Sequence, residues 1–207
     1  MAQDTPVPWP APFPARRHTT TLCHAFPSSH GRPRLLADLS PLIAATTQWL
    51  TRAYPAGGGA LDGALCEAQA RQAVTVAAWL RYPTPTDAAL VGMAGPGGTA
   101  RLDWITGFDE HLTPDEYAWR TWVDEVVASW AACLLADPGL AHAAVAALAG
   151  SPHTTGSPAA FRRLLTPDEL DRRAAALLRH PDLLAPVVTL HHADLVHTLR
   201  PGRALTA

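Results

Sequence analysis

The chain lacks several residue types whose presence would help to assign it to a functional class. Its 207 residues include no lysine and no asparagine, and all 16 basic residues are arginines. Because 18 acidic residues give a formal net charge of -2, net charge provides no general attraction to nucleic acid or to anionic membranes. A GC-rich coding bias explains the absence of lysine, so the arginines alone do not indicate phosphate binding.

Cysteines and long apolar runs are also scarce. Cys23, Cys66 and Cys133 lie far apart and form no CxxC pair, which suits a reducing compartment better than a disulfide framework. No apolar stretch approaches the ~20 residues that cross a bilayer, and the first residues lack the basic and apolar regions of a secretory signal. The sequence therefore predicts a cytoplasmic globular protein that neither binds nucleic acid nor enters a membrane.

Alanine and leucine dominate the composition, whereas isoleucine occurs only at Ile43 and Ile105. Alanine, leucine, arginine and glutamate favour helices, while the β-branched residues that favour strands are few. The chain is also long enough to bury a sizeable core. We therefore expect an all-α fold, a helical bundle of about seven or eight helices.

Residues 1–34, called the arm below, differ from the rest of the chain. Prolines occupy every second position from Pro6 to Pro14, which fixes φ, removes amide donors and favours extended polyproline II. The sequence thus predicts an extended Pro-rich N-terminal arm followed by a single all-α domain over 35–207. A Pro/Gly/Ser/Thr-rich linker at 150–158 marks a possible sub-boundary within that domain.

Start and stop signals predict individual helices. Ser40-Pro41 predicts a helix that continues to about Ala53, and a second helix is expected from about Leu61 to Arg81. The string Thr-Pro-Asp-Glu occurs at 113–116 and again at 166–169. We interpret each copy as a capping box in which the threonine caps the helix and the glutamate returns a hydrogen bond.

Three longer segments follow from these signals. The first capping box predicts one helix to about Ala136, with Glu116 and Arg120 paired on its solvent side. The second predicts a helix from its own threonine to about Arg179. The segment Leu183–Leu199 is expected to be helical, with a strand over 184–192 as the alternative.

One group of residues has the composition of a small-molecule pocket. We predict that three tryptophans wall it, because aromatic side chains supply apolar contact area: Trp104, Trp119 and Trp122. Between them lie the candidate acid–base groups: Asp109, Glu110 and His111. The competing interpretation is structural, because tryptophans at helical spacing usually belong to the core and acidic residues before a helix stabilise its N-terminus.

A second group is rich in histidine. On a helix, His191, Asp194 and His197 would lie on one face at three-residue steps, and imidazole and carboxylate groups bind zinc or iron. A strand would instead place His191 and His192 on opposite faces. No HExxH or paired ExxH motif accompanies them, so we expect no metal and no other cofactor, with these three residues as the alternative metal ligands.

No recognisable nucleophile motif occurs in the chain. The function we favour is that of an accessory or binding protein, for example the non-catalytic helper subunit of a biosynthetic enzyme. It would bind another protein through the arm, because prolines lower the cost of ordering apolar anchors; the expected contact residues are Trp9, Phe13, Arg16 and Arg17. The alternative is a small-molecule enzyme that binds a small apolar ligand in a Trp-lined helical cavity and uses His111, Asp109 or Glu110.

Overall fold

The computed structural model describes residues 38–108, 118–154 and 161–200. These residues belong to one compact unit that spans Leu35–Ala207. All regular secondary structure in the described ranges is helical, and seven helices there have seven or more residues, which confirms the all-α prediction. Within the same ranges, no helix has the length and apolar character needed to cross a membrane.

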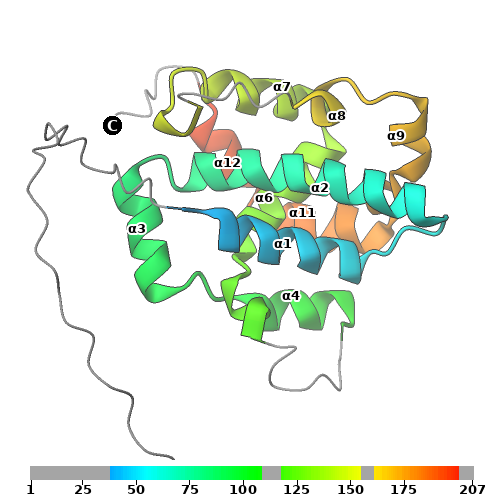
Figure 1. Ribbon diagram of the computed structural model, residues 1–207, viewed down its shortest axis with the longest axis horizontal. Coiled ribbons are helices and arrows are strands. Elements are labelled where there is room, and N and C mark those ends of the chain that lie inside the picture. The colour runs from blue at the N-terminus through cyan, green and yellow to red at the C-terminus, as the bar shows by residue number, and fades with distance from the viewer. Residues whose placement is uncertain (1–37, 109–117, 155–160, 201–207) are drawn as a thin grey trace, which may run out of the picture. The chain divides into compact units, whose positions relative to one another are not determined.

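Four helices form the first part of the unit: α1 (Ser40–Ala53), α2 (Ala60–Arg81), α3 (Pro85–Ala94) and α4 (Thr99–Thr106). The middle part contains the 3-10 helix η1 (Ala118–Trp122), α6 (Glu125–Ala136), α7 (Pro138–Ala147) and the 3-10 helix η2 (Pro152–Thr154). The last part consists of α8 (Arg162–Leu165), α9 (Glu169–Ala174), α10 (Ala176–Arg179), the π-helix η3 (Leu183–Val187), α11 (Val188–Leu190) and α12 (His192–Thr198). The long helix α2 crosses the middle of this unit and packs against α1 and α6 (Figure 1).

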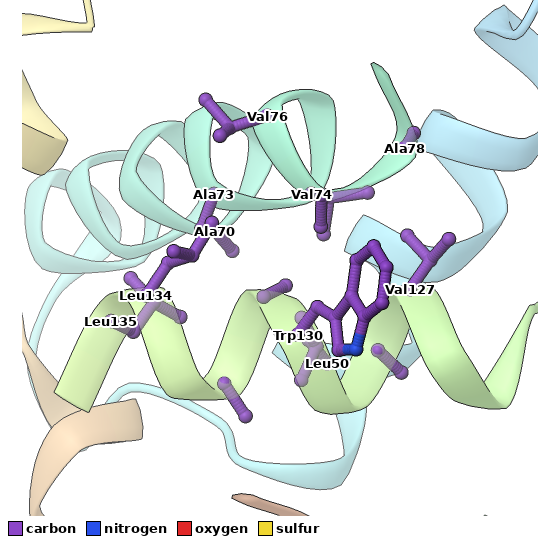
Figure 2. Close-up of a cluster of buried hydrophobic side chains, with 14 of the residues drawn as sticks. Leu50, Ala70, Ala73, Val74, Val76, Ala78, Val127, Trp130, Leu134 and Leu135 are labelled. Atoms are coloured by element: carbon purple, nitrogen blue, oxygen red, sulfur yellow. The ribbon is translucent and has the colours of Figure 1, made fainter. Parts of the chain in front are cut away.

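The core lies between α2 and α6, where α2 contributes mainly small side chains. Ala70, Ala73 and Val74 of α2 are fully buried, and they face Trp130 and Leu134 of α6 (Figure 2). Alanines at the contact let two helices approach closely, while large side chains from the partner helix fill the remaining space. The central helix pair is therefore held by apolar packing.

The two helices predicted most directly from start signals are present. α1 runs from Ser40 to Ala53 and α2 ends at Arg81, as the sequence indicates. On the exposed side of α2, Arg71 and Glu67 form an ion pair at 2.9 Å. Local signals are sufficient to predict these bounds because prolines and glycines lie next to the ends of both helices.

The helix predicted to run from 113 to 136 is wrong in its middle. The first Thr-Pro-Asp-Glu string lies outside the described residues, but η1 ends at Trp122 and α6 begins only at Glu125. Asp124 caps α6, because its Oδ1 accepts hydrogen bonds from the amides of Val126 at 2.8 Å and Val127 at 3.3 Å. Apolar spacing continues across the break, so periodicity alone does not reveal it.

The second predicted capping box is also placed wrongly. The cap is Asp168 rather than Thr166, and α9 starts at Glu169. Asp168 Oδ1 accepts from the amide of Asp171 at 2.9 Å, while Asp171 Oδ2 accepts from the amide of Asp168 at 3.1 Å. The helix then ends at Ala174 instead of continuing to Arg179, because residue 175 has a non-helical backbone.

The segment from Leu183 to Leu199 is helical, so the strand alternative is wrong. Pro186, which has no amide donor, lies inside the π-helix η3. The chain breaks again at His191, whose amide donates to Ser129 Oγ at 3.1 Å and whose carbonyl accepts from Trp130 Nε1 at 3.0 Å. The same carbonyl also accepts from the amide of Leu195 at 3.2 Å. A side chain of α6 therefore takes up the His191 amide, which a continuous helix would pair internally.

Both sides of the 150–158 linker contribute to the same core. Leu134 and Leu148 precede the linker, Phe161 and Leu177 follow it, and all four belong to one buried apolar cluster. The described residues on the two sides of the linker are therefore packed together.

Candidate functional site

The tryptophans predicted to wall a pocket occupy different environments. Trp104 projects from α4 with 84% of its surface exposed, whereas Trp119 and Trp122 are half-buried in η1 against the core. The guanidinium of Arg52 lies over the Trp119 ring, 5.2 Å from its centroid. In the described parts of the chain, none of the cavities seen is lined by these three tryptophans.

Several predicted site residues lie outside the described residues. They are the candidate acid–base residues Asp109, Glu110 and His111 and the partner-binding residues Trp9, Phe13, Arg16 and Arg17. Their proposed roles stay predictions.

A half-buried carboxylate lies next to the tryptophan group. Asp103 of α4 accepts a hydrogen bond from Trp49 Nε1 at 2.8 Å and pairs with Arg120 of η1. Arg120, predicted to lie on a solvent-facing helix side, is almost fully buried and lies over the Phe108 ring at 4.5 Å from the centroid. Because Asp103 has partners in both α1 and η1, we assign it a structural role in joining these elements to α4.

A second buried contact joins α2 to α6. Tyr82, which follows α2, donates its phenolic proton to the capping residue Asp124. Burial, followed by this contact with the carboxylate, raises the pKa of Tyr82. The phenol therefore stays protonated at neutral pH and acts as a donor that holds the start of α6.

The C-terminal histidine group does come together around a cavity. The cavity has a volume of about 420 Å³ and is lined by Arg81, Val126, Trp130, His191, Asp194, His197 and Thr198. Its residues come from the end of α2, from α6, and from α12 with the break that precedes it. The three-residue spacing of the histidine group therefore brings its members to one place, although His191 itself lies at a helix break.

The imidazole of His191 is held between two carboxylates. Its Nε2 lies 2.8 Å from Glu125 Oε1, and its Nδ1 lies 3.4 Å from Asp194 Oδ2. A carboxylate can only accept a hydrogen bond, so a ring nitrogen that bonds either carboxylate acts as the donor. Glu125 also meets Arg101 at 3.4 Å, and the ring of His191 is thereby fixed at the edge of the cavity.

The remaining cavity wall combines an apolar floor with charged groups at the rim. Val126 is half-buried and Trp130 is buried, while Arg81, Asp194 and His197 are exposed. Arg81 lies over the Tyr82 ring at 5.7 Å from its centroid. Among the described residues, no carboxylate forms an ion pair with Arg81.

The cavity does not have the arrangement of a metal centre. Across the described residues, no group of three or more His, Cys, Asp or Glu side chains is placed to hold a metal ion. His191, Asp194 and His197 share a cavity, but they do not converge as a set of three ligands. What this arrangement offers is separated positive and negative charge above an apolar floor.

Sequence reasoning missed Arg81, Glu125 and Trp130. Glu125 lies 66 positions before His191, so no local spacing connects the two residues.

Comparisons of the chain with models of protein families, with curated proteins and with solved structures find no match.

Proposed function

We propose that the protein is a non-catalytic accessory protein that binds another protein, and that α3 forms part of the interface. The observation that carries this proposal is the composition of α3. Eight of its ten residues are apolar, glycine or proline, yet only Ala88 and Val91 are buried. A helix that is apolar on all sides is typical of a protein interior, so an exposed one favours a binding surface.

Exposed apolar side chains on α3 and the following helix support the proposal. Leu90 and Met93 of α3 are 54% and 77% exposed, and Trp104 of α4 is more exposed still. Leu90 and Met93 lie three positions apart on the same helix, so they are neighbours on its surface, and neighbouring apolar side chains at a surface are characteristic of interaction sites. Methionine adapts to varied partner surfaces, and tryptophan contributes strongly to protein interfaces.

A shallow hollow next to α3 offers a place for a side chain of the partner. Its volume is about 220 Å³, and it is lined by Tyr82, Asp87, Leu90, Val91, Ala94, Gly95 and Pro96. Asp87 is the one charged residue in this lining, and its carboxylate is already engaged by the amide and hydroxyl of Thr84. The hollow therefore suits an aliphatic or aromatic side chain.

The helper-subunit role, the cytoplasmic location and the contribution of the arm belong to the same proposal. The arm offers the apolar anchors Trp9 and Phe13 and the cations Arg16 and Arg17. The enzyme alternative depends on Asp109, Glu110 and His111, and nothing in the described residues favours it over the accessory role.

Native mass spectrometry of the protein purified from its own host tests the proposal. We expect a second protein at a fixed stoichiometric ratio, because the apolar surface of α3 is suited to a lasting contact. Replacing Leu90→Glu together with Met93→Glu is expected to abolish the complex. The control Leu61→Glu changes an equally exposed leucine on α2 and is expected to retain it.

A second variant tests the arm separately. Deleting residues 1–34 is expected to weaken the complex by at least about tenfold, since about 1.4 kcal/mol of contact energy corresponds to that factor. Purification of the wild-type protein as a lone chain would contradict the accessory function. An unchanged complex in the α3 double variant would remove α3 from the interface.

A further inference from the structure

We propose that the cavity between α2, α6 and α12 binds a small zwitterion of the α-amino acid class with an apolar side group. The cavity is lined by Arg81, Val126, Trp130, His191, Asp194, His197 and Thr198. It shares no lining residue with the hollow beside α3, so this inference is independent of the proposed accessory function.

Two groups of opposite charge, Arg81 and Asp194, lie at the rim of the cavity. Arg81 presents a guanidinium that no carboxylate of the described chain neutralises, and a guanidinium is well suited to bind a carboxylate. Asp194 presents a carboxylate that is 70% exposed, and among the described residues its one side-chain contact is that with His191 at 3.4 Å. A ligand with both a carboxylate and an ammonium group satisfies both rim charges.

The opposite signs of these groups also disfavour simpler ligands. A purely anionic ligand placed between them would be repelled by Asp194, and a purely cationic one by Arg81. A neutral ligand would gain no attraction from either charge. Complementarity with two separated charges therefore selects a zwitterion.

The inner part of the cavity sets the character of the side group. Val126 and Trp130 form an apolar floor, and the indole of Trp130 is fixed because its Nε1 donates to the carbonyl of His191 at 3.0 Å. Glu125 holds the His191 ring at 2.8 Å, so this side of the cavity is preorganised. A volume of about 420 Å³ lies in the range of roughly 300–1,000 Å³ that small ligands occupy.

Calorimetric titration of the full chain with L-phenylalanine tests the inference, with L-leucine as a second amino acid. Two truncated probes separate the charges: 3-phenylpropanoate lacks the ammonium group, and 2-phenylethylamine lacks the carboxylate. We expect phenylalanine or leucine to bind, and each truncated probe to bind at least about tenfold more weakly than phenylalanine.

Two variants assign each charge to its residue. In Arg81→Gln, phenylalanine is expected to bind no more tightly than 2-phenylethylamine, which lacks the carboxylate. In Asp194→Asn, phenylalanine is expected to bind no more tightly than 3-phenylpropanoate, which lacks the ammonium group. The controls Arg71→Gln and Asp182→Asn change residues of similar exposure outside the cavity and are expected to bind like the wild type. All four positions are exposed, so unchanged circular dichroism is expected to accompany each variant.

Three results would overturn the inference. They are absence of binding for both amino acids at millimolar concentration, equal affinity for phenylalanine and 3-phenylpropanoate, and unchanged selectivity in both cavity variants. Because Leu90 and Met93 do not line this cavity, the α3 double variant is expected to bind the amino acid normally. Failure of one proposal is thereby distinguished from failure of the other.

Discussion

The central helices and the segment from Phe161 to Leu199 are held in place by different means. α2 and α6 meet through alanine, valine and leucine side chains that are completely or almost completely buried. The later segment consists of short helices interrupted at residue 175, in the π-helix and at His191. Its position depends on hydrogen bonds to the central helices as well as on apolar contact.

These hydrogen bonds connect side chains of the central helices to the backbone of the segment. Gln69 Nε2 donates to the carbonyl of Asp171 at 2.8 Å, and the amide of Leu164 donates to Gln72 Oε1 at 3.0 Å. On α6, Ser129 and Trp130 hold the backbone of His191. Short helices leave many backbone groups without an internal partner, so polar side chains of long helices are needed to satisfy them.

The largest expected loss of stability comes from a substitution in the apolar contact between α2 and α6. Leu134→Ala removes a side chain that is 1% exposed, and we expect the free energy of unfolding to fall by about 3 kcal/mol because a cavity replaces packed methyl groups. Chemical denaturation measures this change. The control Leu170→Ala alters an exposed leucine, so a loss as large as that of Leu134→Ala would contradict the assignment of the core.

A smaller effect is expected where the later segment depends on a buried carboxylate. Asp171 is fully buried, pairs with Arg163 and closes the capping box of α9. Asp171→Ala is expected to lower the free energy of unfolding by about 2 kcal/mol, because it removes charged hydrogen bonds.

Amide hydrogen exchange then locates the loss. We expect it to accelerate in residues 161–179 of the Asp171→Ala variant more than in α2. The matched variant Asp171→Asn keeps an oxygen that can accept from the amide of Asp168, so it is expected to lose less stability. Uniform acceleration over all helices would show that the two regions unfold as one unit.

Cys66 and Cys133 lie where the central helices contact the later segment, so their reactivity measures whether this contact is intact. Cys133 Sγ contacts the carbonyl of Val188 at 3.3 Å, and Cys66 lies beside the backbone of Leu177. Burial raises the pKa of Cys66 and raises that of Cys133 to about 11. In a Cys23→Ser background, we expect thiol labelling at pH 8 to be slow, because only about one in a thousand Cys133 thiols is ionised there.

The pH dependence of labelling sharpens this test. Because the thiolate is the reactive form, the rate at Cys133 is expected to rise about tenfold per pH unit until its pKa is reached. Low denaturant concentrations that open the later segment should also raise the rate before α2 and α6 unfold. Fast labelling at pH 7 in the native protein would contradict the burial of both thiols.

The smallest expected change in stability concerns Asp168, the exposed member of the capping box of α9. The backbone amide of Asp171 and the guanidinium of Arg162 lower the pKa of Asp168 from its ordinary value of 3.8. A lowered folded-state pKa means that this carboxylate stabilises the fold above its unfolded pKa, and that the contribution disappears as pH falls through the folded value.

Asp168→Asn keeps the cap but removes the charge. We expect the variant to be slightly less stable than the wild type at pH 7, with the difference vanishing towards pH 2. Thermal unfolding followed across pH measures it. A difference that stayed constant with pH would show that the charge of Asp168 is not its cause.

Local signals in the sequence predict α1 and α2 because Pro41, Pro55 and Gly59 lie close to the helix ends. Ser40 is the first residue of α1, and its side chain does not cap the helix. The break before α6 also has a local signal, since Asp124 is a favoured capping residue, but the continuing apolar pattern conceals it. The break at His191 has no such signal, because it is set by Ser129, 62 positions earlier. Tertiary contacts override local preference at that point.

The candidate cavity is likewise predictable from the sequence only in part. The spacing of His191, Asp194 and His197 already suggests that they lie together, but their chemistry depends on Arg81 and Glu125, which come from distant helices. No pattern within one segment contains that information. The sequence consequently predicts one wall of the cavity, and the packing of α12 against α6 supplies the other.

From the bond between Ser129 and His191 we infer an order of folding events. It closes a loop of 62 positions, and the conformational entropy lost on closure rises with loop length. During synthesis α2 and α6 emerge first, so they can pair while Trp130 still lacks the His191 carbonyl. The cavity is then completed late, and a molecule that binds only the completed cavity stabilises this last step by mass action. Under the ligand proposal above, an amino acid bound in the cavity would therefore favour the folded state over the unfolded one.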